Sequence, residues 1–353
     1  QRQMCIRDSE YTACREKAVL IDLSSLRKFE ILGPDAEELM DYTLTRNVKK
    51  LSVGQIVYSS MCYENGSMFD DGTLLKMSDH GFRWVCGDEY AGEWLKEQAK
   101  KKKFNVLVKN STDQINNISL QGPNSRKILE KFIFTPPTQP SISELQWFRF
   151  TICRVKELSG IPLMVSRTGY TGELGYEIWC HPSDAPAVWD VLMEAGKDEG
   201  IIPAGFGALD LLRIEAGLIL FGNEFDGQVD PFEAGVGFTV PLKTKTADFI
   251  GKEALIKRKE NPQKKLVGLE LVGKEKANHG DCVHIGRSQV GVVTSGCLSP
   301  TLNKNIALCR IDVGHSEIGM NVEVGKIDGH QKRIPAKVVG FPHYDPQKTR
   351  VKS

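Results

Sequence analysis

The sequence predicts an α+β protein that carries a separate all-β domain at its C-terminal end. Two observations favour this class. A unit of strand, Gly-Pro and amphipathic helix occurs twice, at residues 29–40 and 118–129. After about Asn261, short strand-like segments alternate with Gly, Pro and Asn, which is typical of a barrel. The chain of 353 residues is long enough for two or three domains with cores of their own.

Composition excludes several classes of protein. The net charge of +1 provides no global attraction for nucleic acid or an anionic membrane. No apolar run approaches the roughly 18 residues that a membrane-spanning helix requires. The nine cysteines contain no CxxC pair, and the seven histidines contain no HExxH spacing. We therefore expect a cytoplasmic protein with no disulfide framework, no metal site, no nucleic-acid partner and no membrane partner.

The first nine residues, "QRQMCIRDS", show neither the apolar core of a signal peptide nor a helical period. We expect residues 1–9 to be a non-native or truncated leader, and a short disordered tail is the alternative. This stretch is left out of the predicted fold, which begins at about Glu10 and whose first region ends at residue 260.

Between the two repeat units, residues 55–87 alternate like a β-meander, with "ENGS" as a hairpin turn. The next segment, 89–104, predicts a helix that ends in four lysines, and cations favour a helix C-terminus. We expect a solvated helix end there. A docking patch for an acidic partner or a polyanionic tail is the alternative.

Two adjacent carboxylates, Asp70 and Asp71, follow the predicted hairpin. Neighbouring side chains of a strand point to opposite faces, so at most one of the two faces a given pocket. A pair of aspartates that merely stabilises a turn is the structural alternative for this motif.

The segment "RTGYTGELGYEIW", residues 167–179, is more specific. Its three glycines would let the backbone approach a ligand closely. Tyr170 could then offer a flat stacking face, and Glu177 a bidentate acceptor for a ring with adjacent N–H donors, such as a pterin or guanine. A tight hairpin with incidental polarity is the alternative.

The boundary of the C-terminal domain is predicted at "ENPQKK", residues 260–265. The strand-like segments that follow it extend over residues 261–350. Their spacing predicts an all-β barrel of this length.

Several motifs in order resemble the folate-dependent aminomethyltransferase family, which includes the T-protein of the glycine cleavage system. They are "ENGSMFDD", "RTGYTGELGYEI", "LRIEAGLILFGNE", "DFIGKEAL" and "GVVTSGCLSPTLNKNIAL". The resemblance covers residues 10–346. It implies a three-domain cloverleaf with two intertwined α+β folate-binding subdomains in residues 10–260 and a C-terminal β-barrel. The segment "DLSSLRKFEILGPDA" is also similar to the folate domains of dimethylglycine and sarcosine dehydrogenases.

The resemblance implies an enzyme with tetrahydrofolate as cofactor. The expected reaction moves an aminomethyl group to tetrahydrofolate and gives 5,10-methylenetetrahydrofolate and ammonia. The expected partners are folate and a one-carbon donor, which is a lipoylated carrier protein or a small methylated compound, and the chain is expected to be a monomer or a weak dimer. One alternative is a tetrahydrofolate-dependent demethylase of a small methylated amine, sulfonium or ether. A second alternative is a folate-binding protein without catalysis.

The site residues are carried over by the same resemblance. Asp70 is expected to be catalytic because a carboxylate stabilises the positive charge that develops on a reacting ring nitrogen. Tyr170, Glu177 and Arg213 are expected to bind the cofactor. The chain departs from the T-protein pattern at Ser25, Gly87 and Leu209, and the last of these replaces an arginine. A less charged, small donor is the hypothesis that Leu209 motivates.

Overall fold

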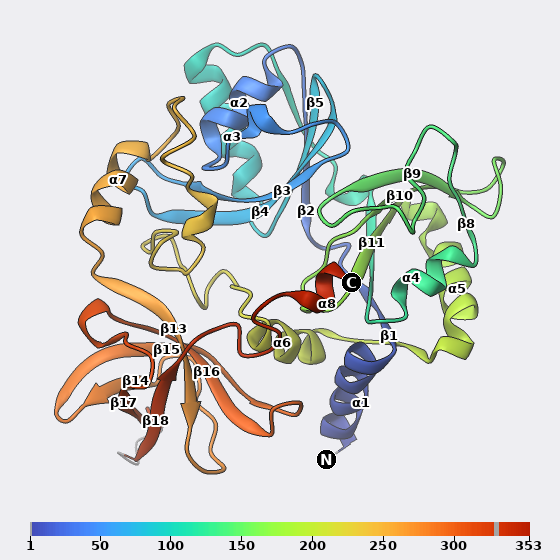
Figure 1. The fold of residues 1–353 in the computed structure, drawn as a ribbon. Coiled ribbons are helices and arrows are strands. Elements are labelled where there is room, and N and C mark those ends of the chain that lie inside the picture. Colours follow the sequence, from blue (N-terminus) through green and yellow to red (C-terminus); the bar gives the residue numbers. More distant parts are fainter. Residues whose placement is uncertain (1, 328–331) are drawn as a thin grey trace.

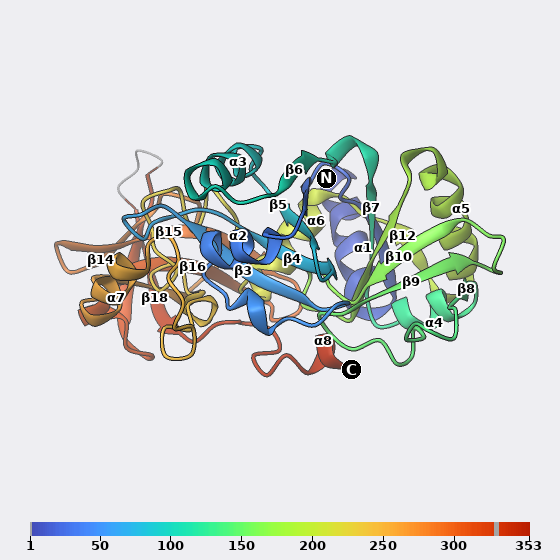
Figure 2. The ribbon, with the colours of Figure 1, turned by 90° about the horizontal axis from the view of Figure 1, so that it is seen from above.

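The computed structural model describes residues 2–327 and 332–353 and has three lobes. A five-stranded sheet, a seven-stranded sheet and a closed barrel surround a centre that contains helix α6 and the C-terminal helix α8 (Figure 1). Viewed from above, the barrel and the seven-stranded sheet lie at opposite ends of the molecule (Figure 2). The α+β class and the C-terminal barrel predicted from the sequence are confirmed.

The first lobe is an antiparallel sheet with the strand order β3-β4-β5-β2-β6. Helices α2 and α3 pack on it, and Trp84 and Trp94 belong to the buried apolar core between them. The lysine-rich end of α3 is exposed, as expected of a solvated helix end. The elements of this lobe are β2 (Arg27–Leu32), α2 (Ala36–Thr43), β3 (Ile56–Cys62), β4 (Met68–Ser78), β5 (Gly81–Cys86), α3 (Tyr90–Lys102) and β6 (Leu107–Asn110).

The second lobe is a sheet with the strand order β12-β1-β7-β11-β10-β9-β8, in which only the β1–β12 pair is parallel. Helices α4 and α5 pack against it through a buried apolar core. Strand β1 comes from the start of the chain, so the chain enters this lobe, builds the first lobe and then returns. The elements are β1 (Ala18–Asp22), β7 (Asn116–Gln121), α4 (Ser125–Glu130), β8 (Ile133–Phe134), β9 (Phe150–Val155), β10 (Pro162–Ser166), β11 (Gly175–Cys180), α5 (Ala185–Gly196) and β12 (Ile201–Pro203).

The predicted repeat is present as β2–α2 in the first lobe and β7–α4 in the second. Each strand is followed by a glycine with positive φ, Gly33 at 137° and Gly122 at 124°. A Cβ at these positions would approach the backbone oxygens of Asn105 and Lys17 to 2.5 and 2.6 Å. The Gly-Pro motif therefore marks a turn that passes close to a neighbouring backbone.

The barrel closes in the order β13-β16-β15-β14-β17-β18, and its interior is filled by apolar side chains. Helix α7 (Lys252–Glu260) precedes it, and α8 (Thr349–Lys352) follows it and packs back toward the second lobe (Figure 1). The strands are β13 (Lys264–Leu271), β14 (Cys282–Ile285), β15 (Ser288–Ser299), β16 (Lys304–Asp312), β17 (Asn321–Gly325) and β18 (Arg333–Val339).

The start of the chain is helical, although its sequence shows no helical period. Helix α1 (Arg2–Glu16) begins inside the nine residues in which the sequence showed no helical period. It packs on α6 (Phe206–Glu215), and its buried side chains Tyr11 and Cys14 belong to the same apolar cluster as Leu212. Tertiary contacts with α6 therefore stabilise a helix whose own sequence signal is weak.

Two glycines of the 167–179 hairpin, Gly169 and Gly175, pack closely against a protein side chain. Cβ atoms at Gly169 and Gly175 would each lie 2.1 Å from Oε1 of Gln121. The Gln121 side chain is fully buried and cannot move aside easily, because its amide donates to Ser119 Oγ and the Thr168 carbonyl and accepts from Thr171 Oγ1. These two glycines therefore make room for the Gln121 side chain.

This packing predicts a steric coupling between Gly175 and Gln121. Gly175→Ala should destabilise the protein by about 1–3 kcal/mol, the usual range for overpacking a buried site. Gln121→Ala removes the obstructing atoms, so the double variant should lose less than the sum of the two single variants. Urea unfolding of the four proteins measures the coupling. Gly314→Ala is the control, because nothing lies within 4 Å of its added Cβ; additive losses would contradict the interpretation.

Candidate functional site

The two neighbouring carboxylates on β4 lie on opposite faces of the strand, as strand geometry requires. Tyr58 on β3 contacts Asp71, whereas Cys86 on β5 contacts Asp70. Among the described residues neither carboxylate forms an ion pair, although a buried charge is normally paired. Strand β4 therefore presents two carboxylates that have different surroundings and no cationic partner.

Asp71 is partly exposed and faces the 167–179 hairpin, which contains Tyr170. Its Oδ2 accepts a hydrogen bond of 2.6 Å from the Tyr58 hydroxyl. Burial raises the pKa of Asp71 to about 6, while the bond from Tyr58 lowers it. The same carboxylate raises the pKa of Tyr170, which burial raises most. Asp71 is thus a partly exposed carboxylate that is bound by Tyr58 and acts electrostatically on Tyr170, with a pKa in the range useful for proton transfer.

Asp70, the carboxylate favoured by the sequence, is only 1% exposed. Its Oδ1 accepts from the backbone N–H of Asp71 at 2.9 Å, and its Oδ2 accepts from that of Asp88 at 3.4 Å. Burial and the charge of Asp71 raise the pKa of Asp70 to about 8. The structure brings Asp70 next to Cys86 and the β5–α3 turn, and does not bring it into contact with Tyr170.

Tyr170 lies between the hairpin and the segment after α6. Its hydroxyl donates to the carbonyl of Ile219, and its ring packs beside the apolar cluster that contains Leu209. Leu209 is 6% exposed, so the position where the family pattern has an arginine is occupied here by a buried apolar contact. The other two departures, Ser25 and Gly87, are both exposed.

Arg213, expected to bind the cofactor, is 1% exposed and is engaged by protein groups. Its guanidinium pairs with Glu224 at 2.8 Å and with Asp210 at 2.8 Å, and Nη2 donates to Ser295 Oγ on β15. Glu224 is itself fully buried. Arg213 therefore joins α6 to the barrel, and this arrangement favours a role in holding Tyr170's surroundings rather than direct contact with a ligand.

Glu177 on β11 is partly exposed and separate from the aspartates. Its Oε1 accepts a 3.0 Å hydrogen bond from Asn117 Nδ2 on β7, and its Oε2 accepts from the Thr168 hydroxyl. Burial raises the pKa of Glu177, whereas Thr168, Asn117 and the ammonium of Lys28 lower it. Asn117 is fully buried, and its Oδ1 is buried without a hydrogen-bond partner among the described residues.

The sequence analysis missed three residues of this region: Tyr58, Asn117 and Lys28. Tyr58 and Asn117 are ordinary strand residues in sequence and become significant only through cross-strand contacts. Lys28 gave no distinct signal, because its strand, RKFEIL, also contains Arg27 and Glu30. Its Nζ donates to the Ser24 and Leu26 carbonyls, and burial lowers its pKa to about 8.

Each of these groups has chemistry that a flat heterocycle with N–H donors can use, although no contact among the described residues joins Glu177 to Tyr170 or Asp71. Glu177 supplies carboxylate acceptors on one side, and Tyr170 offers an aromatic face. Asp71 supplies a carboxylate without a cation, which would stabilise positive charge that develops on a bound ring. No group of three or more His, Cys, Asp or Glu side chains suited to a metal occurs within residues 2–327 and 332–353.

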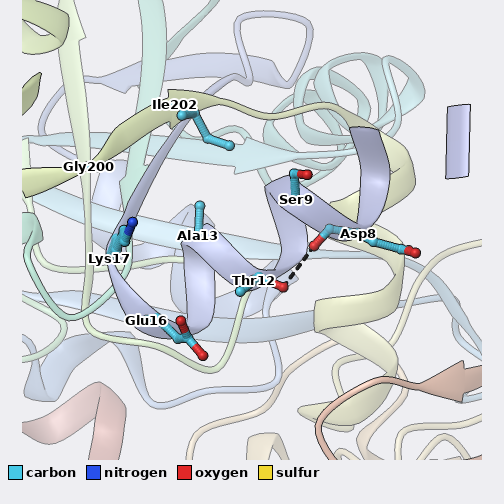
Figure 3. A pocket seen from close by; sticks show the side chains of 8 residues that line it. All are labelled: Asp8, Ser9, Thr12, Ala13, Glu16, Lys17, Gly200 and Ile202. Carbon is cyan, nitrogen blue, oxygen red and sulfur yellow. Dashed lines mark hydrogen bonds between the residues drawn. The ribbon is translucent and has the colours of Figure 1, made fainter. Parts of the chain in front are cut away.

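A separate hollow of about 450 Å³ lies between α1 and β12 (Figure 3). Five of its lining residues come from α1, and the other three are Lys17, Gly200 and Ile202. None of the predicted site residues lines it.

No helix in the described part of the chain has the length and apolar character needed to cross a membrane.

Comparison with known proteins gives two domain matches. Residues 3–244 match the GCVT N-terminal domain, and residues 264–345 match the glycine cleavage T-protein C-terminal barrel domain. A solved aminomethyltransferase T of the glycine cleavage system from Bartonella henselae superposes with a TM-score of 0.84 at 26% identity, over 96% of this chain and 89% of that one.

Two curated relatives carry different names. The trimethylamine-oxide aldolase of Ruegeria pomeroyi is 59% identical over 98% of this chain, and the chain spans 44% of that protein's length. The aminomethyltransferase of Symbiobacterium thermophilum is 40% identical over 95% of this chain and 88% of its own length. With both domains matched and the fold shared, the chain belongs to the glycine cleavage T-protein family of aminomethyltransferases.

Proposed function

We propose that the chain is a tetrahydrofolate-dependent one-carbon transferase, with an aminomethyl group and a small methylated amine as its two candidate donors. The observation that carries the proposal is Asp71, a partly exposed carboxylate without a cationic partner that lies near Tyr58 and Tyr170. Tetrahydrofolate, the cofactor of this family, supplies the nucleophilic nitrogens that accept the one-carbon unit. The acceptors of Glu177 and the aromatic face of Tyr170 fit its pterin ring.

The chain's own residues have separable roles in this proposal. Asp71 stabilises positive charge beside it and takes up or returns a proton, for which a pKa of about 6 is suitable. Tyr58 fixes the Asp71 carboxylate through its hydroxyl. Asp70, assigned as catalytic from the sequence, stays a prediction; its buried contact with the Asp71 backbone N–H supports a role in holding Asp71.

Two donors fit this chemistry. In the first, an aminomethyl group carried on sulfur by a lipoylated protein reacts with tetrahydrofolate and gives 5,10-methylenetetrahydrofolate, ammonia and the free thiol. In the second, the one-carbon unit of a small methylated amine is accepted. Trimethylamine oxide has the composition of dimethylamine plus formaldehyde, so this donor needs no external oxidant. The 59% identical relative and the apolar Leu209 favour the second candidate.

The first prediction for this site compares the two aspartates. Asp71→Asn should lower kcat by about 10²-fold or more, the usual contribution of one positioned acid–base group. Asp70→Asn is the matched control and should lower kcat less. The carboxylate is charged above its pKa, so wild-type kcat/KM should fall as the pH drops through about 6. That acidic limb should be absent from Asp71→Asn. A larger loss in Asp70→Asn would favour the sequence-based assignment.

The second prediction concerns the donor. Formation of 5,10-methylenetetrahydrofolate is measured with three donors: aminomethylated lipoyl carrier, trimethylamine oxide, and formaldehyde as the free one-carbon unit. We expect the Leu209→Arg variant, which restores the family's charge, to improve turnover of the carrier relative to the small donors.

The small-donor candidate would be refuted if wild type and Leu209→Arg turned over the aminomethylated carrier equally well and neither turned over a small donor. If tetrahydrofolate stabilises the protein against heat by the amount that its affinity predicts but no donor is turned over, a folate-binding protein without catalysis would be indicated. If tetrahydrofolate does not bind, the proposed function is wrong.

A further inference from the structure

The hydrogen bonds around the Glu177 carboxylate bear on how a pterin ring is recognised, an inference that rests on the proposed function. Two hydrogen-bond donors approach the carboxylate from different strands. Asn117 Nδ2 on β7 donates to Oε1, and Thr168, which follows β10, donates to Oε2. Both oxygens are therefore fixed in position before any ligand arrives.

The Thr168 side of this arrangement continues as a directed chain. The indole N–H of Trp179 can only donate, and it donates to Ser166 Oγ at 3.0 Å. Ser166 and Thr168 share a 2.9 Å hydrogen bond. Since the single Thr168 proton is used on Glu177, Thr168 can only accept in that bond. The Ser166 hydroxyl proton has two acceptors, Thr168 Oγ1 at 2.9 Å and the Glu177 backbone carbonyl at 3.4 Å. In either arrangement the Thr168 proton is directed to the Glu177 carboxylate.

The Asn117 side supports the same polarity. Its Nδ2 donates to Glu177, and its Oδ1 is left buried without a partner among the described residues. An unpaired buried carbonyl is unfavourable. A flipped amide would place Oδ1 against a carboxylate oxygen of Glu177. While Glu177 is ionised, the repulsion between these two acceptors is less favourable than the unpaired carbonyl. The ammonium of Lys28 is the charged group that acts on Glu177, and it also favours the ionised form.

We infer that Asn117 and Thr168 are positioning residues that hold Glu177 ionised, with both oxygens oriented to receive a ring edge bearing adjacent N–H donors. A protonated Glu177 would present an O–H in place of one acceptor and would bind such an edge poorly. The two residues therefore act on the ligand through Glu177 and determine the pH range in which the pterin edge is recognised.

The test is the affinity for tetrahydrofolate, measured by calorimetry under anaerobic conditions between pH 5 and 7.5. This window stays below the titration of Lys28, whose pKa lies at about 8. Asn117→Leu and Thr168→Val each remove one donor with little change in volume, and Thr168→Ser keeps the hydroxyl. Glu177→Gln removes the titrating group. Titration of the ligand is common to all variants and cancels in the ratio to wild type.

Losing a donor to the carboxylate raises the pKa of Glu177, so affinity should begin to fall at a higher pH. We expect the midpoint of the fall to move up by about one pH unit in Asn117→Leu and Thr168→Val, since a charge-assisted hydrogen bond and one pKa unit have similar free energies. Thr168→Ser should follow wild type. Glu177→Gln should bind weakly, without this dependence on pH.

Stability separates positioning from simple structural support. Asn117→Leu also removes the unpaired carbonyl, so its midpoint of urea unfolding should not fall, while its binding profile shifts. A loss of affinity that is equal at every pH, or profiles in both variants that match wild type, would overturn the inference and leave the proposed function intact. If wild type itself does not bind tetrahydrofolate, the proposed function fails and the inference fails with it.

Discussion

The arrangement of the lobes depends on one buried guanidinium, that of Arg15 on α1. It donates to Glu173 at 2.9 Å and to Glu215 at 2.5 Å, and it lies 4.0 Å from the centre of the Tyr344 ring. The carboxylates of Glu173 and Glu215 are both buried. Because an uncompensated buried charge is strongly destabilising, helix α1, the 167–179 hairpin, α6 and the segment after the barrel must assemble together.

Helix α6 is fixed a second time, by the pair of Arg213 and Glu224, which connects it to β15 of the barrel. The hairpin and the barrel are thereby held on either side of one short helix. Tyr170 follows from this arrangement, since its hydroxyl reaches the carbonyl of Ile219 just beyond α6. The candidate site is thus positioned by ion pairs between buried side chains of separate segments.

The charge pattern distinguishes structural groups from candidate functional ones. The buried arginines Arg15 and Arg213 are paired with carboxylates, whereas Asp71 has a tyrosine hydroxyl and no cation. Glu177 is served by neutral donors and by one lysine at longer range. Carboxylates kept in this state are ready to interact with positive charge or N–H groups that a ligand brings. This is the physical link between the fold and the proposed one-carbon transfer to a nitrogen of tetrahydrofolate.

The sequence by itself determined the elements whose signals are local. The two strand–Gly-Pro–helix units, the β4 hairpin and the barrel follow from periodicity and turn residues, and the family followed from motifs in order. The tertiary structure decided what depends on contacts between distant segments. Helix α1 is stabilised by α6, the hairpin glycines accommodate Gln121, and Arg213 is occupied by Glu224. Strand alternation predicted that Asp70 and Asp71 point to opposite faces of the sheet. Which of the two faces is directed toward Tyr170 depends on how separate lobes pack, and no local sequence pattern encodes that packing.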